Sequence, residues 1–173
     1  MAARPDCDEA EVISWFAGQL PDDWFTEPVS VIIDRDELLI TGKLPEPTSV
    51  PDGEENARVA AESRIASFRD SSRNQRIQIA RAAQTRWLRV VSWAVSCGDE
   101  VKAFKTASVP VMTRLYMPER QILDTLIEAG VARSRSDGLG WCVRQVQQHQ
   151  SEWIEELQDA VKTVEAIRSK GPA

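Results

Sequence analysis

The chain has 173 residues, of which 42% are hydrophobic, and a formal net charge of −6 at pH 7. This length suits one domain or two small ones, and the composition is ordinary for a globular protein. No run approaches the roughly 18 consecutive apolar residues of a membrane span. The acidic N-terminus MAARPDCDEAE lacks the apolar core of a signal peptide, and three scattered cysteines are typical of reduced thiols. We therefore expect a cytoplasmic protein with no membrane partner.

The charge is divided along the chain. Residues 1–55 carry 14 acidic and 3 basic side chains, whereas residues 56–92 carry 8 arginines and 2 acidic side chains. An acidic protein binds DNA poorly unless its basic charge is concentrated on one face. The arginines leave two interpretations open: they pair with the acidic N-terminal region on a solvated face, or they form a second phosphate-contacting surface.

The first 107 residues predict a small α+β module. Their patterns indicate a helix, a hairpin, a linker, an arginine-rich helix and a second hairpin, over residues 8–20, 28–44, 45–56, 57–88 and 91–106. Asp8 would cap the first helix. Asp34 and Asp36 form a charged hairpin turn and not a calcium loop, since the central glycine and distal glutamate are absent. The arginine-rich segment is one helix, or two helices broken near Asp70.

Residues 108–150 predict a strand followed by two helices. Alternation places Val111, Thr113, Leu115 and Met117 on one strand face, and Met112, Arg114 and Tyr116 on the other. Pro118 is preset for a first helical turn, and Gly130 lies where that helix would stop. Ser134 with Asp137 forms a capping-box-like start of the second helix. Because such a unit cannot bury its own apolar faces, we expect the strand to pair with its twin in a homodimer.

The strand TRLYMP, the helix ERQILDTLIEAG and the turn VARSRSD are similar to ribbon-helix-helix DNA-binding proteins, the class of the Arc and methionine repressors. The resemblance covers residues 112–146. It implies an antiparallel ribbon lying in the major groove of double-stranded DNA and a second helix that offers its N-terminus to a phosphate. The DNA-contacting residues implied by the resemblance are Met112, Arg114, Tyr116, Arg133, Ser134, Arg135 and Ser136. Gly138 and Gly140 depart from the family pattern, and each costs roughly 1 kcal/mol relative to alanine in a helix.

The apolar spacing continues past the ribbon-helix-helix-like unit. Val143, Val146, Gln150, Trp153, Leu157, Ala160, Val164 and Ile167 follow one another at intervals of three and four residues. This spacing predicts that the second helix extends into a coiled-coil-like helix over residues 151–173, with Gln150 as a polar interruption. The stripe would serve self-association or packing on the N-terminal module.

No catalytic, metal or cofactor site stands out. His149 is the only histidine, so no Ser/His/Asp set is credible, and no glycine-rich phosphate loop is present. We therefore expect a non-enzymatic, dimeric DNA-binding protein that regulates transcription, without a cofactor. Two alternatives stay open: an interaction protein that uses the same unit only to self-associate, and an antitoxin-like protein. The N-terminal module would sense a ligand, hold a protein partner or shield the basic surface.

Overall fold

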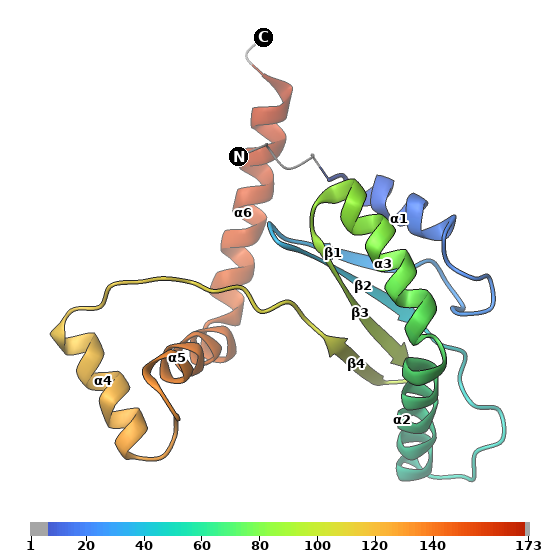
Figure 1. Ribbon diagram of the computed structural model, residues 1–173, viewed down its shortest axis with the longest axis horizontal. Helices are drawn as coiled ribbons and strands as arrows, with labels where there is room; N and C mark the ends of the chain where they lie inside the picture. Colours follow the sequence, from blue (N-terminus) through green and yellow to red (C-terminus); the bar gives the residue numbers. More distant parts are fainter. Residues whose placement is uncertain (1–6, 172–173) are drawn as a thin grey trace. The chain divides into compact units, whose positions relative to one another are not determined.

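The structure, a computed structural model, describes residues 7–171. They divide into two units, one ending at Pro110 and the other beginning at Val111. The first unit contains three helices and four strands and the second contains three helices, as Figure 1 shows. Their bounds are α1 Glu9–Ala17, β1 Ser30–Ile33, β2 Glu37–Lys43, α2 Glu54–Ser71, α3 Arg73–Trp87, β3 Val90–Cys97, β4 Glu100–Lys105, α4 Met117–Glu128, α5 Arg135–His149 and α6 Ser151–Lys170.

Two hairpins share one sheet in the first unit. The strand order is β1-β2-β3-β4; β1–β2 and β3–β4 are antiparallel, and β2 pairs with β3 in parallel from Glu37↔Val90 to Lys43↔Ser96. The α2–α3 pair provides the crossover that a parallel connection requires. The α+β class and the order of helices and hairpins predicted for this unit are confirmed.

Short polar contacts fix the local structure where the sequence predicted it. The Asp8 carboxylate accepts a hydrogen bond from the Glu11 N–H at 3.0 Å and caps α1. Asp34 Oδ1 accepts from the N–H groups of Asp36 and Glu37, each at 2.6 Å, and closes the first hairpin. The arginine-rich segment is broken at Ser72, which separates α2 from α3.

Aromatic side chains dominate the core of the first unit. Phe16 and Trp87 are almost fully buried and stack with centroids 6.3 Å apart, and Trp93 meets Phe16 edge to face at 5.8 Å. Trp24 packs on Phe68 with ring centroids 5.1 Å apart, and Phe25 contacts the same ring at 5.5 Å, so both aromatic residues after α1 belong to the packing of this unit. Buried Leu38, Ile40 and Val95 supply the sheet side of this core.

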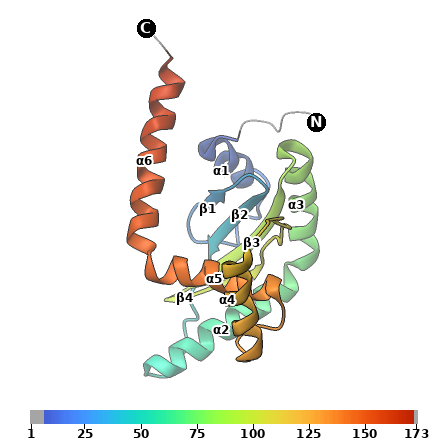
Figure 2. The same cartoon turned by 90° about the vertical axis from the view of Figure 1, so that its left-hand side faces the viewer.

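The second unit packs α4 against α5, and α6 leaves α5 at a steep angle (Figures 1 and 2). The prediction of one continuous helix through Gln150 is wrong. The helix ends at His149 because Gln150 has φ −131° and ψ 27°, outside the helical region, and the next helix starts at Ser151. Within the described part of the chain, no helix is both long and apolar enough to cross a membrane.

The predicted strand over residues 111–117 is not formed in the single chain. Residues 106–116 have no regular secondary structure, and α4 already begins at Met117. A strand is held by hydrogen bonds to a neighbouring strand, and residues 111–171 supply none. Residues 111–116 therefore pair with no other strand of residues 7–171.

Candidate nucleic-acid interface

The turn between α4 and α5 is tightly built. Gly130 has φ 73°, and the Val131 N–H bonds to the Leu126 carbonyl at 2.9 Å, so α4 ends in the left-handed turn predicted there. Ser134 Oγ accepts from the Asp137 N–H at 3.2 Å, and Asp137 Oδ2 accepts from the Arg133 N–H at 2.9 Å. These two bonds form the predicted capping-box-like start of α5, in which Asp137 accepts from the N–H of Arg133, one residue before the N-cap Ser134.

An ion pair across this turn orients the first residue of α5. Arg135 donates from Nε and Nη2 to the two carboxylate oxygens of Asp124 on α4, both at 2.7 Å. Hydrogen bonding to Arg135 lowers the pKa of the Asp124 carboxyl. Because the Arg135 side chain is paired with Asp124, only the backbone N–H of Arg135 remains to bind an anion at the start of α5.

The first turn of α5 leaves backbone donors at the surface. The N–H groups of Arg135 and Ser136 lie in the first turn of α5, where no helical carbonyl lies four residues earlier to accept from them, so they can donate to an external anion. Ser136 is exposed, and the Arg133 side chain is 98% exposed. Of the predicted site residues, Arg133, Ser134, Arg135 and Ser136 thus share one helix start.

The other predicted site residues lie on the unpaired segment before α4. Met112 is 98% exposed and Tyr116 80% exposed, and Arg114 is also exposed. No hydrogen bond or ion pair among the described residues joins these three to the α5 start. Arg120 Nη1 donates to the Leu115 carbonyl at 2.7 Å and fixes the entry of the segment into α4.

Gly138 has a packing role that the sequence pattern did not reveal. It is buried, and a β-carbon added there would lie 3.3 Å from Leu123 Cδ2 and 3.6 Å from the Ala132 β-carbon. Leu123 and Ala132 are the buried hydrophobic side chains of the second unit within the described residues. The glycine therefore allows α5 to approach α4 closely.

This contact predicts opposite effects at two neighbouring glycines. Gly138→Leu should destabilise the second unit by about 1–3 kcal/mol because the side chain overpacks the contact with Leu123. Gly140→Ala is the matched control: its added β-carbon would meet only the flexible end of Arg144 at 3.4 Å, so it should stabilise by about 1 kcal/mol. Chemical unfolding followed by circular dichroism measures both, and equal effects would contradict the role of Gly138.

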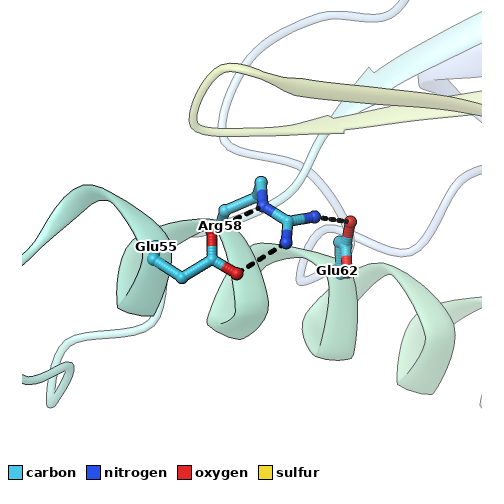
Figure 3. A network of polar contacts seen from close by, with 3 residues as sticks. All are labelled: Glu55, Arg58 and Glu62. Atoms are coloured by element: carbon cyan, nitrogen blue, oxygen red, sulfur yellow. Dashed lines mark hydrogen bonds and ion pairs between the residues drawn. The ribbon is translucent and has the colours of Figure 1, made fainter.

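The arginine-rich helices form mostly internal contacts. Arg58 on α2 donates hydrogen bonds to Glu55 at 2.6 Å and Glu62 at 2.7 Å, as Figure 3 shows, and the bond to the Glu55 carboxylate raises the Arg58 pKa. Arg86 on α3 pairs with Glu11 on α1 at 2.5 Å. Pairing with acidic groups is thus the better description of these two arginines, and Glu11 belongs to the acidic N-terminal region.

Four exposed arginines remain on α2 and α3 without such partners. The side chains of Arg64, Arg69, Arg73 and Arg81 form no hydrogen bond or ion pair with the rest of residues 7–171, although Arg69 lies 5.7 Å from the centroid of the Phe104 ring. In the same part of the chain, no group of three or more histidine, cysteine, aspartate or glutamate side chains could hold a metal ion.

Comparison with known proteins divides the chain near the boundary between its two units, at Pro110 and Val111. Residues 10–103 match the family model described as the Rv1265-like protein, N-terminal domain, and residues 116–168 match the Mb1296 C-terminal domain. The uncharacterized protein Mb1296 of Mycobacterium bovis is 47% identical over 171 residues, which cover 99% of this chain and 74% of the relative. The chain belongs to the Rv1265-like family. The uncharacterized protein Rv1265 of Mycobacterium tuberculosis matches with the same identity and coverage.

The names of these Rv1265-like relatives state no activity, so family membership does not supply a function. No solved structure matches the chain. The two matched domains fall on either side of the boundary between the sheet-containing unit and the helical unit. The two family matches thus agree with the division of the chain into an α+β unit and a helical unit.

Proposed function

We propose that this protein is a homodimer that binds double-stranded DNA through residues 112–146 and regulates transcription. The observation that carries the proposal is the exposed apolar surface next to the capped α4–α5 pair. Val111 is 84%, Met112 98% and Tyr116 80% exposed. So much apolar surface on one short segment favours a partner strand, and a second copy of the same segment would supply it as an antiparallel ribbon.

The helices of the second unit support the same assembly. Ile122 on α4 is 58% exposed, and Val143 and Val146 on α5 are 63% and 47% exposed. In a ribbon-helix-helix dimer these faces close into a four-helix core. Since α6 bends away after His149, its own stripe, which includes Trp153, would form a separate self-association surface.

The proposed DNA surface combines one groove contact with one phosphate contact. Arg114 would reach base edges from the ribbon, flanked by Met112 and Tyr116. The N–H groups of Arg135 and Ser136 would hold a phosphate at the start of α5. Arg133, with its exposed side chain, would add positive charge beside them.

A second candidate function is self-association alone. The observation that favours it is the charge of the helical unit: residues 111–150 carry five basic and four acidic side chains, and residues 151–173 carry three basic and five acidic ones. The Arg135 side chain is also neutralised by Asp124. In this alternative the ribbon forms the dimer, and the partner is a protein.

Fluorescence anisotropy with random duplex DNA across a salt series tests the DNA proposal. Wild type should bind non-specifically at roughly 10⁻⁴–10⁻⁶ M, with log affinity falling linearly with log salt. Arg114→Ala should weaken binding about tenfold or more and flatten the salt slope. Asp124→Asn should tighten binding, because it removes a negative charge and frees Arg135.

Arg168→Ala on α6 is the matched control, since it removes the same charge outside residues 112–146. It should leave the affinity near that of wild type. Absence of binding by wild-type dimer at low salt would favour the self-association function. Equal affinity of wild type and Arg114→Ala would exclude the ribbon as the DNA reader.

A further inference from the structure

A cavity of about 480 Å³ lies within the first unit, beside β3 and under the segment that follows β4. Trp93 and Phe104 line it together with Val90, Val91 and Ala107, and two cations, Arg76 and Lys105, also face it. Glu37 Oε1 accepts a hydrogen bond from the Ala107 N–H at 2.7 Å. This bond ties Ala107, in one wall of the cavity, to Glu37 on β2.

Arg76 is the unusual group in this cavity. It is only 8% exposed, and its guanidinium lies 4.6 Å from the centroid of the Phe104 ring. Nε donates to Ser72 Oγ at 2.9 Å and Nη2 donates to the Arg69 carbonyl at 2.6 Å. Neither bond uses Nη1, and no carboxylate within residues 7–171 forms an ion pair with Arg76.

A buried cation of this kind is costly without an anion. Burial lowers the Arg76 pKa, and the neighbouring charges of Arg69 and Arg73 lower it further. Asp70 is the carboxylate whose charge raises the Arg76 pKa, but it forms no ion pair with Arg76 within residues 7–171. Buried charges in proteins are normally paired, and a guanidinium pairs best with a carboxylate that accepts from two of its N–H groups.

We propose that this cavity binds a small organic monocarboxylate, with its carboxylate on Arg76 and its apolar body against Trp93 and Phe104. The lining decides the ligand class. Arg76 is the buried cation of the lining and matches one carboxylate, whereas Lys105 is exposed and keeps its charge in solvent. The surrounding aromatic and aliphatic side chains match an apolar body and not a fully hydrated anion. The site lies in the first unit alone and does not depend on DNA binding.

Isothermal titration calorimetry of the full chain with phenylacetate tests the proposal. Phenylacetate should bind with a Kd below about 1 mM. Phenylacetamide, which keeps the shape but lacks the charge, should bind about tenfold more weakly or not at all. Inorganic phosphate should behave likewise, because it lacks the apolar body. Equal binding of phenylacetamide or phosphate would overturn the assignment, as would absence of binding by phenylacetate, indole-3-acetate and isovalerate alike.

Two variants locate the site. Arg76→Gln should weaken phenylacetate binding about tenfold or more, and Ala107→Phe should do the same by filling the cavity while leaving the α2–α3 junction intact. Arg81→Gln, an exposed change on the same helix, should leave binding unchanged. Arg76 also donates hydrogen bonds to Ser72 and to the Arg69 carbonyl, so Arg76→Gln could unfold the α2–α3 junction. In that case Ala107→Phe still tests whether phenylacetate binds in the cavity. Wild-type affinity in Ala107→Phe would overturn the location.

Discussion

Gly42→Ala is expected to destabilise the first unit by about 1–3 kcal/mol, and Gly42→Val by more, because the added atoms overpack the core. A β-carbon at Gly42 would lie 2.3 Å from Phe25 Cε1, a distance that real contacts do not reach. Gly42 lies in the middle of the sheet, where it pairs with Val95 on β3. Because β2 is held by strands on both sides, the Phe25 ring must move away from its contacts with Trp24 and Phe68. Urea unfolding followed by tryptophan fluorescence measures the loss.

A double-mutant cycle identifies the cause of this loss. Combining Gly42→Ala with Phe25→Ala removes the clash, so the double variant should be more stable than the sum of the two single effects predicts. Gly18→Ala is the control, since its β-carbon would meet only the Trp15 carbonyl at an ordinary 3.6 Å. Additive effects at Gly42 and Phe25 would contradict the close approach.

A proline in the ribbon segment is expected to weaken dimerisation, and with it DNA binding, by about tenfold to a hundredfold without unfolding the chain. Met112→Pro and Thr113→Pro are made separately. Because ladder bonds alternate along an antiparallel pair, one of the two variants must remove an N–H that bonds the twin strand. Each such bond contributes about 0.5–1.5 kcal/mol and is lost twice in a symmetric dimer. In the single chain residues 106–116 have no regular structure, so the proline should be tolerated there.

Analytical ultracentrifugation gives the dimer affinity, and anisotropy gives the DNA affinity of each proline variant. Ser108→Pro, which adds proline before residues 111–117, should behave as wild type. Undiminished dimerisation of both Met112→Pro and Thr113→Pro would mean that residues 111–117 do not form the ribbon. It would leave α6, with its exposed Trp153, Leu157 and Ile167, as the alternative self-association surface.

The elements that the sequence predicted well are those set by local chemistry. Asp8, Asp34 and Ser134 each satisfy backbone N–H groups within a few residues, so their roles follow from short motifs. Gly130 is similar, because its positive φ belongs to one turn. The parallel pairing of β2 with β3 could not be predicted this way, since it joins segments separated by two helices and depends on the whole core.

The candidate site shows the same division. The helix start at Ser134 was predictable, but the Asp124–Arg135 ion pair joins residues 11 positions apart across a turn and has no local signal. Gly138 was predicted as a weakness of the helix, whereas its small size permits the contact with Leu123. The sequence did not predict that the helix breaks at Gln150. The apolar spacing continues through this residue, and residues 148–152 contain neither glycine nor proline.

Hydrogen–deuterium exchange of the amides in residues 111–117, measured across a range of protein concentrations, tests the central claim most directly. In a ribbon alternate amides of this segment are bonded to the twin strand, so their exchange should slow as the dimer forms. DNA should slow the exchange of Arg135 and Ser136 as well. Rapid exchange throughout residues 111–117 in a sample that is fully dimeric would contradict the ribbon, and with it the proposed mode of DNA binding.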